Sequence, residues 1–268
     1  MMTKLKATIY RNGKSYFADL SQPLNIGMPL TEGLPGPNCF YAPPMSTVPV
    51  VFGDFIGSTA KGGSVNFLNV TFNPHGNGTH TECVGHIAKA RFTVNQCLKE
   101  FHFFAKLVSV FPTQQDNGDR VILQHQLTET VAPGEADALI LRTLPNDERK
   151  LTANYSGSNP PYLHPDAATF LVDCGVEHLL LDLPSADKEK DGGALLSHRA
   201  FWGYSGQVDD LPRENCTITE LIYVPPAIKD GLYLLNLQIA AFEIDASPCK
   251  PILFHLNPVP ETTELFFT

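Results

Sequence analysis

Residues 72–86 read FNPHGNGTHTECVGH and hold three of the nine histidines of this 268-residue chain. His80, Glu82 and His86 are separated from one another by even numbers of residues. On an extended chain, even spacing places side chains on one face. Two imidazoles and a carboxylate on one face can bind a divalent metal ion. The stretch therefore predicts a metal centre; the alternative is a histidine cluster that only caps buried carbonyl groups.

Two glycines precede this pattern. Gly76 and Gly78 allow the backbone to turn tightly, and such a turn could bring His75 back toward the same ion although its odd spacing alone points it away. We expect the glycines to prevent a helix here, so the segment differs from the helical HExxH zinc motif. The odd phase of Cys83 predicts that this thiol points into the core.

The composition limits the class of protein. Hydrophobic residues make up 43% and charged residues 18%, which is typical of a globular chain, and we expect a single domain over residues 1–268. The net charge of −9, without a basic cluster, argues against nucleic acid or an anionic membrane as partner. No apolar run approaches the roughly 18 residues of a membrane span. Six cysteines without a CxxC pair, and an N-terminus unlike a signal peptide, predict reduced thiols and a cytoplasmic location.

Short segments rich in β-branched residues predict most of the regular structure. The expected strands are 6–10, 65–72, 106–111, 138–142, 178–183, 217–223 and 231–240, and the expected helices are 95–101, 165–174 and 193–204. A long loop is expected over 33–49. Helix 165–174 followed by strand 178–183 is an α/β unit, and the many other short strands favour a mixed sheet.

The motif also carries a family resemblance. Gly78-Thr79-His80-x-Glu82-x-x-x-His86 resembles the GTHxDAPxH signature of the metal-dependent cyclase and kynurenine formamidase-like hydrolases. Further similar segments follow in the family's order over roughly residues 19–255: Asp19-Leu20-Ser21, the strand 136–143 ending in Arg-Thr, Pro184-Ser185-Ala186-Asp187 and Asp245-Ala246-Ser247-Pro248.

The resemblance implies an α/β fold in which a swivelling, barrel-like mixed sheet carries peripheral helices. It also implies one or two zinc or manganese ions per chain and a homo-oligomer, either a dimer or a tetramer. His80 and Glu82 would be ligands from the first motif, and His198 and Glu220 would complete the site from the second half. His75 would join them through a one-residue bulge.

The resemblance further implies hydrolysis of a non-peptide C–N bond in a small molecule, a formamide or a cyclic amide or imide, by metal-activated water. His86 would act as the general acid and base that protonates the departing nitrogen. Asp182, Ser185 and Asp187 could orient ligands, or they could form only a strand-end turn. The alternatives are a lactone or ester hydrolase, and a non-catalytic metal- or ligand-binding member of the fold.

This sequence departs from the family pattern at several positions. Gly76 stands where the family has a histidine, Glu82 replaces an aspartate, and Cys83-Val84-Gly85 replaces the segment with Ala-Pro before the last histidine. An insertion lies around residues 206–215. These differences bear on the number of metal ions and on substrate specificity.

Overall fold

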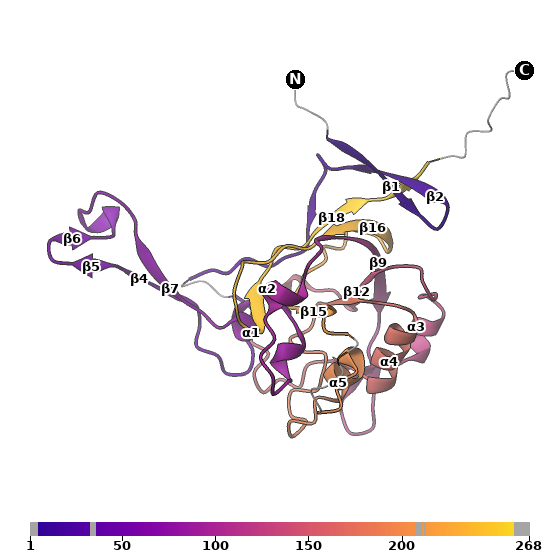
Figure 1. The fold of residues 1–268 in the computed structure, drawn as a ribbon. Coiled ribbons are helices and arrows are strands. Elements are labelled where there is room, and N and C mark those ends of the chain that lie inside the picture. The colour runs from indigo at the N-terminus through magenta and orange to yellow at the C-terminus, as the bar shows by residue number, and fades with distance from the viewer. Residues whose placement is uncertain (1–4, 33–35, 207–210, 212, 260–268) are drawn as a thin grey trace, which may run out of the picture.

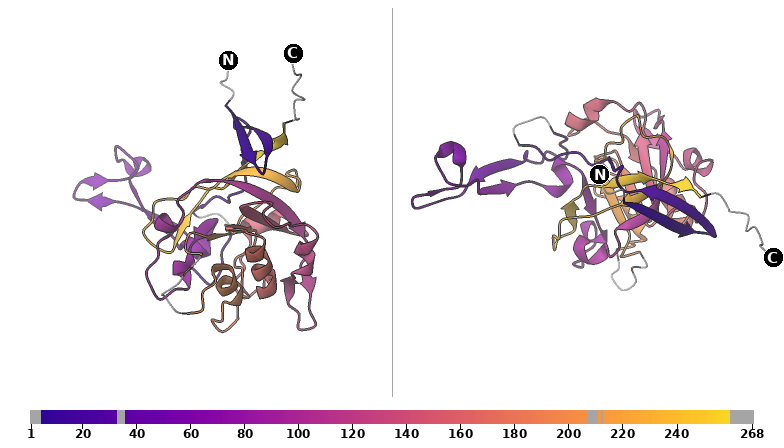
Figure 2. Two further views of the ribbon diagram at one scale, coloured as in Figure 1. Left: turned by 45° about the vertical axis from the view of Figure 1, so that its right-hand side comes forward. Right: turned by 90° about the horizontal axis from the view of Figure 1, so that it is seen from above.

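A strongly curled, half-barrel sheet of nine strands forms the centre of the molecule (Figures 1 and 2). The structure is a computed structural model that describes residues 5–32, 36–206, 211 and 213–259. The strand order is β17-β8-β15-β14-β12-β9-β16-β18-β3. In that order the strands are Ala246–Pro248, His80–Glu82, Thr217–Glu220, His178–Leu181, Ala138–Thr143, His102–Val110, Gly231–Asn236, Ile252–His255 and Leu24–Asn25. The four central strands β15, β14, β12 and β9 run parallel, and the flanking strands are antiparallel.

The central strands are buried on both faces. Every residue of β12 and of β14 is buried, as their continuous runs of leucine and isoleucine predict for strands inside a covered parallel sheet. Leu139 and Leu141 belong to the core on one face, whereas Ile140 and Leu180 belong to the core on the other face. Burying a leucine of this kind contributes about 1.5–3 kcal/mol.

Two helices, α4 (Pro165–Asp173) and α5 (Leu196–Trp202), pack together against one face of the sheet. The imidazole of His164 caps α4 by accepting a hydrogen bond from the amide of Asp166. The remaining helices are single turns: α1 (Pro74–Asn77), α2 (Val94–Cys97), α3 (His125–Thr128), η1 (Thr59–Lys61), η2 (Val84–His86) and η3 (Glu148–Thr152). No helix of the described chain has the length and apolar character that crossing a membrane requires.

Smaller sheets surround the main one. One is β1 (Lys6–Arg11), β2 (Lys14–Asp19) and β19 (Asn257–Pro258), and another is β10 (Thr113–Gln114), β11 (Arg120–Ile122) and β13 (Tyr162–Leu163). Residues 46–71, here called the arm, project away from the body in every view (Figures 1 and 2). The arm pairs β4 (Ser46–Pro49) with β7 (Leu68–Thr71) and ends in the hairpin of β5 (Val51–Phe52) and β6 (Phe55–Ile56).

The α/β class and the mixed, barrel-like sheet are confirmed, and most predicted elements are present with shifted ends. The predicted helix 193–204 begins only at Leu196, because Leu195 adopts a left-handed conformation with φ of 48°. The predicted helix 95–101 is wrong in length: α2 ends at Cys97, where Leu98 turns to an extended conformation. The predicted strand 65–72 is shorter, as β7, and lies in the arm rather than in the main sheet. Parts of the loop 33–49 and of the insertion 206–215 lie outside the described residues.

Candidate metal centre

Strand β8 provides the first two candidate ligands. His80 and Glu82 are fully buried and lie on one face of this strand, as their even spacing predicts. The neighbouring strand β15 places Glu220 directly opposite His80. As a result, Nε2 of His80 lies 3.5 Å from Oε2 of Glu220.

His75 reaches the same place by a route that the sequence did not predict. We expected a bulge and no helix, but residues Pro74–Asn77 form one helical turn. The turn is stabilised by Pro74 at its first position and by Asn73, whose side-chain oxygen accepts a hydrogen bond of 3.0 Å from the amide of Gly76. It directs Nδ1 of His75 to within 3.1 Å of Oε2 of Glu82.

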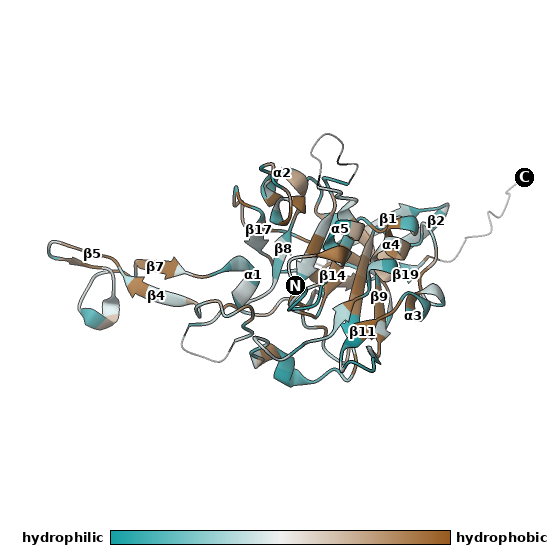
Figure 3. Cartoon of the chain, turned by 90° about the horizontal axis from the view of Figure 1, so that it is seen from below, coloured by the Kyte–Doolittle hydropathy of each residue, from teal (hydrophilic) through white to brown (hydrophobic). Residues whose placement is uncertain are grey.

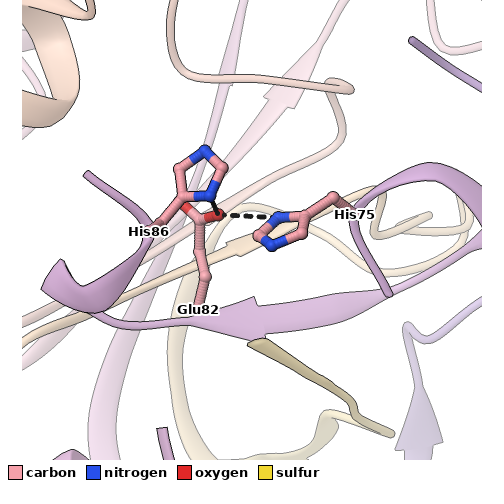
Figure 4. Close-up of side chains that lie close together, drawn as sticks. All are labelled: His75, Glu82 and His86. Carbon is pink, nitrogen blue, oxygen red and sulfur yellow. Dashed lines mark ion pairs between the residues drawn. The ribbon is translucent and has the colours of Figure 1, made fainter. Parts of the chain in front are cut away.

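His86 closes the first motif. The extended chain ends at Glu82, and the short helix η2 then turns His86 back over this carboxylate (Figure 4). Nδ1 of His86 lies 3.8 Å from Oε2 of Glu82. Its side chain is 29% exposed, whereas that of His80 is fully buried. His86 therefore stands on the accessible side of the cluster.

His198 comes from helix α5 in the second half of the chain. Its Nε2 lies 3.0 Å from Oε1 of Glu82, and its Nδ1 lies 2.5 Å from Oδ2 of Asp187. The carboxylate of Asp187 also accepts hydrogen bonds from the amides of Ser197 and His198. Asp187 therefore fixes the orientation of the His198 ring, and its contact leaves Nε2 directed at Glu82.

Two groups of three donors share Glu82: His75, Glu82 and His86 form one, and His80, Glu82 and Glu220 form the other. In each group the donor atoms lie within 4.8 Å of one another. Among the described residues, Nε2 of His80 and Oε2 of Glu82 are buried and make no hydrogen bond of good geometry. Each has only an ion-pair contact: Nε2 of His80 with Glu220 at 3.5 Å, and Oε2 of Glu82 with His75 at 3.1 Å. Imidazole and carboxylate donors suit zinc and manganese, so the cluster fits a divalent ion.

The carboxylates remain ionised although they are buried. Burial raises the pKa of Glu82, but the nearby imidazoles of His86, His198 and His75 outweigh it and hold this pKa well below its usual range. The pKa of Glu220 is also lowered: burial and Glu82 oppose the shift, and His198 and His80 cause it. Conversely, Asp245 and Glu82 raise the pKa of His75 to about 10 against the effect of burial. The pKa of His198 is raised as well, by Asp187, Glu220 and Glu82 against the effect of burial, so protonated imidazoles balance the carboxylates. A bound cation would take the place of these protons, because a metal ligand must be deprotonated.

Asp245 is a member of this cluster that sequence reasoning missed. Its Oδ2 lies 2.9 Å from Nε2 of His75 and 3.4 Å from Nδ1 of His86. The hydrogen bonds from these two imidazoles lower the pKa of Asp245. The segment 245–248 matched the family only as a turn, and no local spacing connects it to the first motif. The Asp at the start of that turn was the available signal.

Of the other residues that the sequence analysis singled out, Asp187 contacts a candidate ligand and the rest do not. Asp187 contacts His198, whereas Asp182 binds Lys150 at 2.7 Å and the amide of Thr143 at 2.8 Å. Asp182 therefore connects the ends of two neighbouring strands and neither orients a candidate ligand nor forms the local turn that was the alternative. Ser185 accepts a hydrogen bond from the amide of Asp187. Cys83 is fully buried in a small core cluster with Val94 and Cys97, as its odd phase predicts.

The fold is similar to that of several known structures, some of which are described as metal-dependent hydrolases. The chain superimposes on a "predicted metal-dependent hydrolase" from Bacillus stearothermophilus with a TM-score of 0.59 and 14% identity, covering 87% of this chain and 98% of the other. A "potential metal-dependent hydrolase with cyclase activity" gives a TM-score of 0.60 and 15% identity, with coverages of 87% and 98%. Isatin hydrolase A from Labrenzia aggregata gives 0.59 and 10%, with coverages of 87% and 93%.

The sequence itself identifies the family. The model of the family described as "Putative cyclase" matches residues 18–188, which is more than half of the chain. The chain therefore belongs to this cyclase family, as the resemblance of its motifs indicates. No curated protein shows significant sequence similarity to it.

Proposed function

We propose that this protein is a metal-dependent hydrolase that cleaves a non-peptide C–N bond in a small molecule, either a formamide or a cyclic amide or imide. The observation that carries the proposal is the pair of groups of possible metal ligands that share Glu82, in which Nε2 of His80 and Oε2 of Glu82 are buried and make only ion-pair contacts. A purely structural role would not require the partly exposed His86 beside them.

In this proposal His80, Glu82 and Glu220 hold the metal, and His75 and His198 add imidazole donors around the same carboxylate. These residues would hold one ion, or two if His75 and His198 bind a second ion beside Glu82, and imidazole and carboxylate ligands suit zinc and manganese. A bound divalent ion lowers the pKa of water toward about 7 and polarises a carbonyl group.

His86 is then the residue that moves the proton. Amide cleavage needs a general acid, because an amide nitrogen leaves poorly as an anion. His86 is placed for this role by its exposure, and Oδ2 of Asp245, 3.4 Å from Nδ1, can hold the ring in place. Nε2 then remains free to take a proton from the attacking water and to pass it to the departing nitrogen.

The choice of a C–N bond draws on the relatives. Isatin hydrolases, whose fold the chain shares, act on a cyclic amide by their name. A substrate panel tests the choice: an N-formyl aromatic amino acid, isatin, a cyclic imide and a lactone of similar size. The protein is purified without chelator and its metal content is measured in the same preparation. Turnover of an amide that stops on chelation supports the proposal.

The alternatives give different results in the same assay. Turnover of the lactone alone would identify an ester hydrolase. Full metal content without turnover of any compound would favour a binding protein on the same fold. A chain that retains no divalent ion, and gains no activity when zinc or manganese is added, would contradict the proposal as a whole.

A further inference from the structure

Two of the six cysteines, Cys83 and Cys97, lie in contact in the small core cluster beside β8. Cys83 directly follows Glu82 and begins the helix η2. Cys97 ends the helix α2, which lies beside β17 at the edge of the main sheet (Figures 1 and 3). The thiol of Cys83 donates a hydrogen bond to the sulfur of Cys97. Both are free thiols, so the structure holds a reduced pair.

The backbone holds the two thiols in place. The amide of Cys83 donates a hydrogen bond of 3.0 Å to the carbonyl group of Asp245. The amide of Val94, the first residue of α2, donates one of 2.8 Å to the carbonyl group of Ile244. The segments that carry Cys83 and Cys97 are therefore bound to adjacent residues of one stretch of chain, and the sulfur atoms meet without a large movement of either segment.

Only Cys97 of this pair reaches a cavity. Cys83 is fully buried, whereas Cys97 lines a cavity of about 310 Å³ together with Cys216 and several charged side chains. Cys216 precedes β15, so the cavity lies at the opposite end of this strand from Glu220. A water molecule occupies about 30 Å³ in the liquid, and a molecule of the size of hydrogen peroxide fits easily. A small oxidant can thus reach Cys97 without entering the metal centre.

The hydrogen bond between the thiols also favours the reactive form of Cys97. It lowers the pKa of Cys97, and Lys99 acts in the same direction, against burial and Glu214. The same bond raises the pKa of Cys83. Burial raises the pKa of each remaining cysteine: Cys39, Cys174, Cys216 and Cys249. Because the thiolate is the nucleophile in cysteine chemistry, we expect Cys97 to react before the other thiols.

We propose that Cys97 is a site of oxidation by hydrogen peroxide and that Cys83 converts the oxidised sulfur into a disulfide. The thiolate of Cys97 attacks one oxygen of the peroxide, and the O–O bond breaks. The sulfur becomes a sulfenic acid, and the other oxygen leaves as hydroxide, which takes up a proton to give water. The sulfur of Cys83 then attacks the sulfenic sulfur, the S–O bond breaks, and the hydroxyl group leaves with the proton of Cys83 as a second water. Two electrons pass from the two thiols to the peroxide.

The disulfide would also act on the metal centre, because Cys83 lies between Glu82 and the helix η2 that carries His86. The sulfurs of a disulfide lie about 2.05 Å apart, closer than two thiols approach, so the bond draws η2 and α2 together. Little space is available, since a Cβ on Gly85 would lie 2.3 Å from the carbonyl oxygen of Phe92. We therefore expect oxidation to displace Glu82 and His86 and to weaken metal binding. This consequence, unlike the oxidation itself, rests on the proposed function.

Treatment of the reduced, folded protein with hydrogen peroxide tests the proposal. Thiol counting and mass spectrometry of unreduced peptides follow the reaction. The wild type should lose two of its six thiols and yield a peptide pair joined through Cys83 and Cys97. Cys83→Ser should stop at a sulfenic acid on Cys97 that dimedone traps, and Cys97→Ser should keep all of its remaining thiols. The control Cys216→Ser removes the other thiol of the cavity and should form the disulfide like the wild type.

A wild type that keeps all six thiols would overturn the proposal, and so would a disulfide between other cysteines. A Cys97→Ser protein that is oxidised as quickly as the wild type would overturn it as well. If the variants do not fold, the peptide map of the wild type decides. These readouts need neither turnover nor a bound metal, so they are independent of the proposed function.

Zinc titration of the oxidised protein, before and after reduction with dithiothreitol, measures the effect on the metal centre. We expect oxidation to lower the affinity for zinc by roughly 10-fold or more, as loss of a residue that supports a ligand does, and reduction to restore it. Equal affinity in the oxidised and reduced proteins would contradict the link between the disulfide and the metal centre.

Discussion

Nε2 of His198 lies 3.0 Å from Oε1 of Glu82, although 116 residues separate them in the chain. The other oxygen of the same carboxylate faces His75 and His86. Glu82 is therefore the point at which the first motif and helix α5 meet. Both groups of possible metal ligands contain Glu82. The negative charge of this side chain is therefore shared by the whole site.

Replacing Glu220 by alanine should lower metal content and thermal stability together. Glu220 lies opposite His80 and accepts a hydrogen bond of 2.8 Å from the amide of Ala186, so its loss removes a ligand and leaves a buried donor unpaired. An ion that binds only the folded state stabilises it, and the stabilisation falls as the dissociation constant of the ion rises. Elemental analysis and a melting curve on one preparation check this prediction. Full metal content with an unchanged melting temperature in Glu220→Ala would argue against ligation.

His86→Ala tests whether His86 transfers a proton or binds the metal. If His86 transfers the proton, turnover should fall by about 10²–10⁴-fold, while metal content stays near that of the wild type. If His86 is instead a required ligand, metal content falls in step with turnover. Measuring both quantities on the same sample distinguishes the two roles, and metal loss would show that our assignment of His86 is wrong.

Asp187→Asn should weaken metal binding although Asp187 is not itself a ligand. The substitution removes the charge that holds Nδ1 of His198 at 2.5 Å. Loss of such a supporting carboxylate typically costs about 10–100-fold in metal affinity or activity. Titration with zinc, followed by a competing chelator, measures the affinity. The exposed Asp116→Asn is the control and should bind like the wild type; equal affinity in Asp187→Asn would contradict the positioning role.

The buried His178 lies outside the metal centre, and its titration should make the stability of the protein depend on pH. Burial lowers the pKa of His178 to about 4, although Asp137 opposes the shift, and Nδ1 contacts Oγ1 of Thr217 at 2.8 Å. The unfolded chain, with an ordinary histidine pKa of about 6.5, therefore takes up the proton first as the pH falls. The stability that the folded state gains from holding His178 neutral is complete above pH 6.5 and is lost progressively toward pH 4.

The size of this effect follows from the two pKa values. Between pH 7 and pH 5 the wild type should lose roughly 2 kcal/mol more of its free energy of unfolding than His178→Gln, which has no proton to gain. Urea unfolding of both proteins at the two pH values provides the comparison. An identical pH dependence in the two proteins would show that His178 does not titrate in this way.

Local patterns were sufficient for much of the fold and for part of the site. The strand patterns of 138–142 and 178–183 predicted β12 and β14, and the even spacing of His80 and Glu82 predicted their common face. His198 and Glu220 were found only through the family resemblance. Because each joins the site from a distant part of the chain, no spacing rule connects them to β8.

Other features depend on tertiary context that the sequence pattern does not contain. Asp245 was missed because its two histidine partners lie 159 and 170 residues away. The strand pattern of 65–72 could not reveal that β7 belongs to a projecting arm, because an exposed strand and a half-buried strand use the same residues. The single domain, the cytoplasmic location, the metal identity and the oligomer stay predictions.

The most direct test of the central claim is the metal content of Glu82→Gln compared with Glu135→Gln. Glu135 pairs with Lys106 outside the site, at 2.7 Å, and is the matched control. Glutamine keeps the shape of Glu82 but removes the charge shared by both donor groups. After equilibration with zinc and dialysis, we expect the control to retain metal like the wild type and Glu82→Gln to lose most of it. A Glu82→Gln protein that keeps the wild-type metal content would contradict the account.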